Sequence, residues 1–227
     1  YDDSAGQLCT FDQPNAYVDS SQPQECLEQG CGTFQYPFKT IGRALEMINP
    51  SESNPITIHL AAGTYSPESG ENFPTCMISN VNIEGEDEET TILDAMQTSW
   101  VVEISNCDNN TISGITITGG TTGGMFVRSS NPALTHVTIA GNTTDLFGGG
   151  ILLDASNPVL THVSITGNTA ALYAGGMCLF SSNPTLINVT ISDNTASSYS
   201  GGMRLFSSNP TLINSIIWDN SPEPINL

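Results

Sequence analysis

Short runs of alternating hydrophobic and polar residues return at a fixed distance along the second half of the chain. The segment that starts SSNPALTHV at Ser129 recurs three times. Its asparagines follow one another at intervals of 26 residues: Asn131, Asn157, Asn183 and Asn209. A fixed period in this range predicts a solenoid, in which each coil buries its apolar residues by stacking on its neighbours. Less regular coils in the same frame precede it, because ISNVNI and ISGITI align with LTHVTI.

Each coil contains stretches in which apolar residues alternate with polar ones, as in strands with one buried face. We expect the apolar residues to face inward in columns: Leu134/Leu160/Leu186/Leu212, Val137/Val163/Val189, Ile139/Ile165/Ile191/Ile217, Met125/Ile151/Met177/Met203 and Val127/Leu153/Leu179/Leu205. Two residues rather than one separate the Leu and Val columns, so the chain must bend there. The residues at the bend tolerate a left-handed backbone: Asn80, Gly114, His136, His162, Asn188 and Asn214. This corner and three short parallel strands per coil predict an all-β, right-handed parallel β-helix.

The N-terminal part carries the spacing of a helix. Ile41, Ala44, Leu45 and Ile48 lie at i, i+3, i+4 and i+7, which predicts an amphipathic helix that ends before the following Asn-Pro pair. The end of a solenoid needs a cover, so we expect this helix to cap the first coil. Residues 1–55 are therefore interpreted as an extension with the capping helix, and residues 56–227 as a β-helix continuous with it.

The C-terminal end differs from the repeats before it. Trp218 replaces small residues in its column, and Pro222 and Pro224 stop further strand pairing. This end is a candidate for self-association or for contact with a further domain.

The repeated motifs carry a family resemblance. GNTTDLFGGGILL, GNTAALYAGGMCL and DNTASSYSGGMRL resemble repeats of the polymorphic outer membrane protein type, within the wider pectate-lyase-like right-handed β-helix superfamily. Upstream, AYVDSS, GTFQYPFKTIGRALEMI and ITIHLAAGTYS look like the start of bacterial secreted β-helix proteins of that superfamily. The resemblance implies the fold but not the activity, because the superfamily includes polysaccharide lyases, glycoside hydrolases, epimerases, adhesins and passive surface proteins.

The charge balance narrows the range of partners. The 227 residues include 23 acidic and 4 basic side chains, a formal net charge of −19. Binding of nucleic acid or an anionic membrane needs clustered Lys and Arg, so neither is expected. No apolar run of about 18 residues is present, so no membrane insertion is expected. Eighteen of the acidic residues lie at or before Asp108, and such a surface attracts divalent cations, which makes calcium the candidate cofactor while its ligands stay unidentified.

Six cysteines lack the spacing of a metal site. At least two disulfides are expected, and the candidates are Cys9, Cys26, Cys31, Cys76 and Cys107. Cys76 and Cys107 precede aligned strands and are candidates to join neighbouring coils, whereas Cys178 is the cysteine least expected to pair. Disulfides and the resemblance together predict a secreted or cell-surface location.

Two polar columns are interpreted as architecture. His136 and His162 stack one coil apart, but they occupy the corner column and are not expected to be catalytic or to bind metal. A second column, three residues after each inward Ile, predicts an internal ladder that bonds the backbone of the turns: Asn142, Asn168, Asn194 and Asn220.

Few residues are suited to catalysis. Outside the cap the basic side chains are Arg128 and Arg204, and Asp154 shares an outward column with Arg128 on the adjacent coil. The two could pair across the strand spacing of about 4.8 Å. Arg128, Asp154 and Arg204 are candidates for ligand binding. No paired Asp motif of the hydrolase kind is present, and we expect no lyase or hydrolase activity.

One outward column is rich in hydroxyl groups: Thr116, Thr138, Ser164 and Thr190. Such a lattice could bind ice or a crystalline polysaccharide, although Thr is also a good strand residue. The sequence thus favours a non-catalytic extracellular module with a surface, adhesion or structural role and a glycan or cell-surface protein as partner. A polysaccharide lyase or glycoside hydrolase is the alternative, and an ice- or crystal-binding protein is a third.

Overall fold

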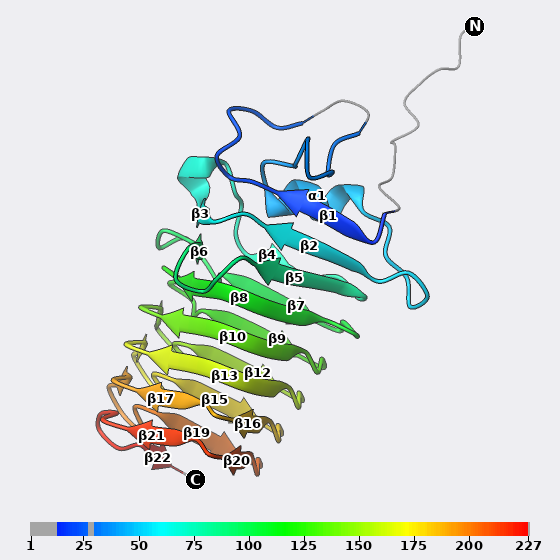
Figure 1. The fold of residues 1–227 in the computed structure, drawn as a ribbon. Coiled ribbons are helices and arrows are strands. Elements are labelled where there is room, and N and C mark those ends of the chain that lie inside the picture. Colours follow the sequence, from blue (N-terminus) through cyan, green and yellow to red (C-terminus); the bar gives the residue numbers. More distant parts are fainter. Residues whose placement is uncertain (1–12, 27–29, 227) are drawn as a thin grey trace, which may run out of the picture.

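A computed structural model describes residues 13–26 and 30–226 of the chain. The chain winds as a parallel β-solenoid whose coils stack from the N-terminal to the C-terminal end (Figure 1). Every strand pair in the three sheets is parallel and joins neighbouring coils within the described residues. The predicted all-β, right-handed parallel β-helix is therefore confirmed.

The largest sheet follows the order β1-β2-β5-β8-β10-β13-β16-β20, with β3, β6, β17 and β21 beside this path. Its strands are β1 (Asn15–Val18), β2 (Ile56–Leu60), β3 (Gly63–Tyr65), β5 (Val81–Gly85), β6 (Thr91–Asp94), β8 (Thr111–Thr118), β10 (Ala133–Ala140), β13 (Val159–Thr166), β16 (Thr185–Ile187), β17 (Thr190–Ser192), β20 (Thr211–Ile213) and β21 (Ile216–Trp218). We refer to it as the first sheet.

The described residues form two further sheets, of which the third is confined to three successive coils. The second sheet has the order β22-β19-β15-β12-β9-β7-β4. Its strands are β4 (Thr75–Cys76), β7 (Val102–Ser105), β9 (Met125–Arg128), β12 (Ile151–Asp154), β15 (Met177–Phe180), β19 (Met203–Phe206) and β22 (Ile225–Asn226). The third sheet consists of two-residue strands, β11 (Thr143–Thr144), β14 (Thr169–Ala170) and β18 (Thr195–Ala196).

The predicted corner column has left-handed backbone at every position. All six residues have φ between 50° and 63°: Asn80, Gly114, His136, His162, Asn188 and Asn214. The expectation of separate strands on either side of the corner holds only in the later coils. In β8, β10 and β13 the strand continues through the bend, whereas the next coil divides into β16 and β17.

The predicted inward columns form the core. Leu134 pairs in register with Leu160, and Leu160 with Leu186. The buried cluster continues from Ala16 in β1 to Met203 in β19, so one core runs through the stack. The paired glycines before the second-sheet strands fit the same stacking, because a Cβ on Gly176 would lie 2.5 Å from the carbonyl oxygen of Gly202.

The predicted asparagine ladder is also present. Asn142, Asn168, Asn194 and Asn220 are buried, and each Oδ1 accepts from the backbone N–H of the equivalent residue one coil earlier or, for Asn142, of Gly120. Each Nδ2 donates to the carbonyl of an inward Ile, as Asn168 does to Ile139 at 2.9 Å. The ladder satisfies turn groups that no strand partner reaches.

The N-terminal end is covered by β1 and by helix α1 (Ile41–Met47), which packs against β1 and β4 (Figure 1). Thr40 caps the helix, since its hydroxyl accepts from the N–H of Arg43. The buried carboxylate of Glu71 accepts from the N–H groups of Ile41 and Gly42, at 2.6 and 3.0 Å. β1 lies in the predicted N-terminal extension, and it pairs with β2 as the first strand of the first sheet.

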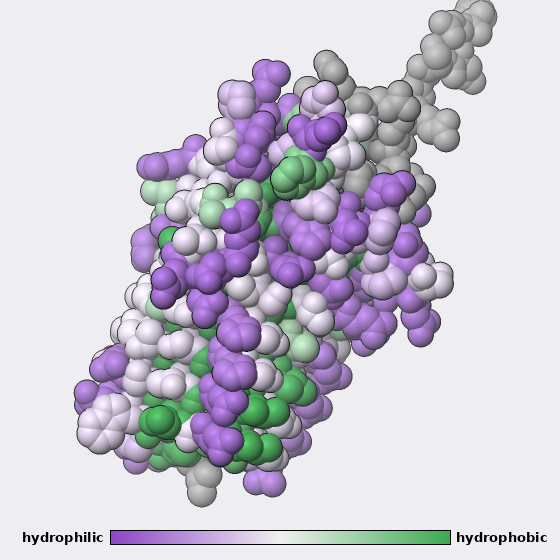
Figure 2. Space-filling view, in the orientation of Figure 1, coloured by the Kyte–Doolittle hydropathy of each residue, from purple (hydrophilic) through white to green (hydrophobic). Residues whose placement is uncertain are grey.

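The hydropathy of the exposed side chains changes along the solenoid. Figure 2 shows mostly hydrophilic side chains over the N-terminal half and hydrophobic side chains exposed toward the C-terminal end. In the last coil, Leu212 belongs to an inward column but is 40% exposed, and Trp218 is 69% exposed. Self-association or a further domain at this end stays a prediction.

The disulfide prediction needs correction. Among the described residues one disulfide is present, between Cys26 and Cys31. Cys76 and Cys107, which the sequence offers as a link between coils, are free thiols, and so is Cys178. Cys9 lies outside the described residues. The sequence aligns the coils of Cys76 and Cys107, but it does not determine whether the two sulfur atoms meet.

Candidate functional site

The outer side of the second sheet carries three of the seven residues that the sequence offers for binding. Because side chains alternate along a strand, each strand presents two outward positions. One outward column is Glu103, Phe126, Leu152, Cys178 and Arg204. The other is Ser105, Arg128, Asp154, Phe180 and Phe206. The predicted binding residues Arg128, Asp154 and Arg204 therefore lie on one surface.

A row of aromatic side chains borders these columns. Phe147, Tyr173 and Tyr199 occupy the same position in successive turns and are joined by parallel β-bridges. Their ring centroids lie 5.3 and 5.2 Å apart along the row. Phe180 and Phe206 stack in the neighbouring outward column at 4.6 Å. These five rings form a continuous surface, which we call the aromatic face.

Arg204 lies over this aromatic face. Its guanidinium carbon is 4.7 Å from the ring centroid of Phe206 and 5.5 Å from that of Tyr199. A guanidinium at this distance is attracted by the negative face of the ring. The contact holds a hydrogen-bond donor beside the aromatic rings.

A small cavity of about 220 Å³ adjoins the aromatic face toward the N-terminal end. Trp100, Phe126, Phe147 and Leu152 contribute to its lining, and Trp100 stacks on Phe126 with ring centroids 5.6 Å apart. The aromatic surface thus continues across several coils.

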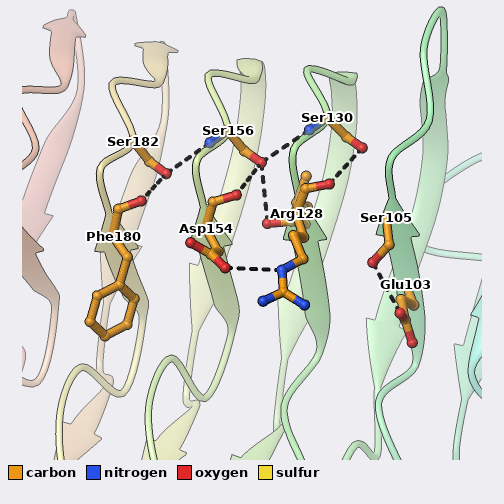
Figure 3. Close-up of polar contacts among 9 residues, drawn as sticks. Glu103, Ser105, Arg128, Ser130, Asp154, Ser156, Phe180 and Ser182 are labelled. Carbon is orange, nitrogen blue, oxygen red and sulfur yellow. Dashed lines mark hydrogen bonds and ion pairs between the residues drawn. The ribbon is translucent and has the colours of Figure 1, made fainter.

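The predicted pairing of Arg128 with Asp154 is present (Figure 3). Arg128 Nε lies 3.1 Å from Asp154 Oδ2, and both side chains are solvent-accessible, at 57% and 38%. An exposed pair of this kind contributes at most about 1 kcal/mol to stability. It does, however, occupy one of the carboxylate oxygens that a catalytic acid or base would need.

A serine ladder fixes the turn that follows these strands (Figure 3). Ser156 Oγ accepts from the N–H of Ser130, and Ser182 Oγ accepts from that of Ser156. Each of these hydroxyls donates to the carbonyl two residues before it. The ladder keeps the ends of adjacent strands in register.

Cys178 faces outward from the second sheet and is nevertheless fully buried. Surface side chains rather than the core must therefore cover it. Burial raises its pKa to about 12, against a smaller lowering by Arg204. The thiol is protonated at neutral pH and is not a nucleophile.

The hydroxyl column lies elsewhere, on the first sheet. Thr116, Thr138, Ser164 and Thr190 pair in register as the sequence predicts. The next residue in the column is Ile216, so the hydroxyl lattice ends there. His136 and His162 stack in parallel at 5.0 Å in the corner column and are not brought near Arg128 or Arg204 by any contact in the described residues.

Sequence reasoning missed the aromatic face. Phe147, Tyr173 and Tyr199 lie 26 residues apart, so the repeat itself contained the signal. The contact of these rings with Phe180 and Phe206 could not be predicted from the sequence. One column belongs to a turn and the other to a strand, and their relative placement depends on how the coil closes.

No metal site is evident in the part of the chain that the structure describes. Among residues 13–26 and 30–226, no three His, Cys, Asp or Glu side chains converge as metal ligands do. Within the same residues, no helix has the length and apolar character required to cross a membrane. Calcium binding stays a prediction that rests on the net charge.

The stacked parallel coils, the left-handed corners and the internal asparagine ladder define a right-handed parallel β-helix protein. The chain belongs to the family described as "Protein of unknown function (DUF1565)", whose model matches residues 28–220. No curated protein matches the sequence.

Two solved structures are similar to the chain. Pectin methylesterase PemA from Erwinia chrysanthemi has 11% identity and a TM-score of 0.43, with 92% of this chain and 86% of that chain covered. A pectin methylesterase mutant in complex with a hexasaccharide has 12% identity and a TM-score of 0.40, with 86% of this chain and 70% of that chain covered.

Proposed function

We propose that this protein is a non-catalytic, extracellular polysaccharide-binding module of the cell surface, and that the aromatic face is its binding surface. One observation carries the proposal. Aromatic rings on successive coils form a continuous row, and Tyr199 at its end is 48% exposed. Side chains of this size are costly to expose in a row unless they meet a partner.

The spacing of the rings suits a chain of sugars. Centroids along the row are 5.2 to 5.3 Å apart, because each coil contributes one ring. A pyranose ring has an apolar face of axial C–H groups, and neighbouring sugars in an extended polysaccharide follow one another at a similar distance. The stacked rings cover one another's faces, so a glycan that lies along the solenoid axis would pack one sugar against the outer edge of the ring on each coil and remove apolar area from water.

The charged groups beside the aromatic face favour a neutral glycan. Arg204 supplies guanidinium donors for hydroxyl groups next to the rings. The guanidinium of Arg128 is already paired with Asp154. With a net charge of −19 the protein repels polyuronates, unless calcium lies between the two.

Catalysis is not part of the proposal. General acid–base chemistry needs a group held near the substrate proton with a suitable pKa. On this surface, Asp154 is bound to Arg128, Glu103 accepts a hydrogen bond from the hydroxyl of Ser105, and the thiol of Cys178 is buried and protonated. The residues that remain can bind and orient a glycan.

Affinity electrophoresis in gels that contain soluble polysaccharides tests this proposal. The panel consists of neutral glucans, xylans and mannans, and of polyuronates with and without calcium. At least one neutral polysaccharide should retard the protein. The Tyr199→Ala variant should bind about tenfold more weakly, which corresponds to the loss of one ring contact of roughly 1.4 kcal/mol. Tyr36→Ala, which removes an exposed ring at the other end of the molecule, is the matched control and should bind as the parent does.

The same panel tests for turnover. New reducing ends, unsaturated ends that absorb ultraviolet light, or methanol from methyl-esterified pectin would favour an enzyme if they disappear in Arg128→Ala or Arg204→Ala. Absence of binding to every polysaccharide, or equal binding by Tyr199→Ala and the parent, would refute the glycan-binding proposal.

A further inference from the structure

We infer that a second site, at the N-terminal end of the solenoid, binds an organic ammonium cation. A cavity of about 510 Å³ opens on the outer side of β1, β2 and β5. Its volume is within the range of small-molecule sites, about 300–1,000 Å³. The inference is independent of the polysaccharide-binding proposal, because the cavity belongs to the first sheet and the aromatic face to the second.

The pairing of three strands builds the centre of this site. In β1, β2 and β5 the residues alternate between core and surface, and Tyr17, His59 and Glu84 are all outward. The parallel register places Tyr17 beside His59 and His59 beside Glu84. An aromatic ring, an imidazole and a carboxylate therefore line up across three adjacent strands.

The aromatic wall is made of stacked rings. Tyr17 and His59 stack with centroids 5.0 Å apart and planes at 22°. Phe34 meets Tyr17 edge-on at 5.5 Å and is 79% exposed, so one of its faces remains open. The negative face of an aromatic ring attracts cations, and it does so most strongly for cations with a weakly held hydration shell.

The lining of the cavity is also acidic. Asp19, Glu84 and Glu86 line the cavity, and no Lys or Arg is among the described residues that line it. Partial burial would raise the pKa of Asp19, but hydrogen bonds from Ser21 and Gln22 hold it below its usual value. Asp19 is therefore ionised at neutral pH, and the cavity holds carboxylates beside its aromatic rings, with Glu84 Oε2 3.4 Å from Nδ1 of His59.

This combination selects an ammonium group rather than a metal ion. A metal needs several converging ligands, and no such group of three exists among residues 13–26 and 30–226. An ammonium with apolar substituents matches both parts of this lining, since the carboxylates balance its charge and the rings pack on its methylene or methyl groups. Both a quaternary ammonium and the primary amine of an alkyl chain have this chemistry.

The experiment measures binding of choline and, separately, of cadaverine by calorimetry at constant ionic strength, with sodium chloride as the reference salt. At least one of the two amines should bind with a dissociation constant of about 1 mM or tighter. Stronger binding of choline would point to a quaternary ammonium, and stronger binding of cadaverine to a primary one.

Two variants and two matched controls locate the site. Phe34→Ala and Glu84→Gln should each weaken binding about tenfold, the first by removing a ring and the second by removing a charge. The controls are Tyr36→Ala, which removes an exposed ring, and Glu89→Gln, which removes an acidic group. Neither residue lines the cavity, so both variants should bind the amine as the parent does. Circular dichroism would confirm that all four proteins are folded. Binding of neither amine, or equal losses in variants and controls, would overturn the inference.

Discussion

Replacing Asn168 with alanine should lower the free energy of unfolding far more than replacing Asn157, although both asparagines belong to ladders that repeat every coil. Asn168 is fully buried. Its Oδ1 accepts from the N–H of Asn142 at 3.0 Å, and its Nδ2 donates to the carbonyl of Ile139 at 2.9 Å. Alanine removes both partners and leaves no path for water to replace them.

The magnitude follows from these two groups. A buried backbone group that loses its hydrogen bond costs about 1–3 kcal/mol, so the Asn168→Ala variant should lose about 2–6 kcal/mol. Asn157 is exposed, and its Oδ1 accepts from the N–H of Asn183 at 2.7 Å. Water can take that place, so Asn157→Ala should lose about 1 kcal/mol or less.

Urea unfolding of the parent and both variants checks this comparison. Far-ultraviolet circular dichroism follows the strands, and tryptophan fluorescence gives a second probe. Coincident transitions are required before free energies are compared, because stacked repeats can unfold in parts. Equal losses in the two variants, or a larger loss for Asn157→Ala, would refute the argument that burial of the inner ladder determines its contribution.

Three further predictions concern the corner, the cap and the thiols. Asn188→Val should lower stability by about 1–3 kcal/mol, since a β-branched residue is strained at φ 54°, while Asn188→Gly should lose less; equal shifts in thermal melts would contradict this. Burial raises the pKa of Glu71, so its stabilising contribution is present at low pH and is lost as the pH rises through the raised folded-state pKa. The free energies of unfolding of the parent and of Glu71→Gln should therefore be compared at pH values of about 4.5 and 7. The parent should be more stable relative to the variant at the lower pH, and a difference that does not change with pH would contradict this prediction. A thiol reagent should label exposed Cys76 in the native protein and Cys178 only after unfolding, as peptide mass spectrometry would show; native labelling of Cys178 would mean that its cover is absent.

Several features of the fold could be predicted from the sequence because they repeat. Stacked coils place equivalent residues at the same position, so a column such as Leu134, Leu160 and Leu186 reports the packing of a whole sheet. The corner was equally predictable, since left-handed backbone restricts the residue type at each bend, and His136 and His162 were correctly assigned to it. The pairing of Arg128 with Asp154 followed from the same register.

The remaining features required the closed coil. The row Tyr17, His59 and Glu84 includes β1 and β2, which lie outside the aligned repeats, so only the pairing of β1 with β2 and of β2 with β5 brings it together. The aromatic face likewise joins a turn column to a strand column, and their separation depends on how each coil closes. The sequence period determines which residues stack along the axis, because stacking is a translation by one repeat. Two kinds of contact depend instead on the path of the chain in space: those between different positions of one coil and those with the non-repeating N-terminal segment. These contacts form both candidate sites.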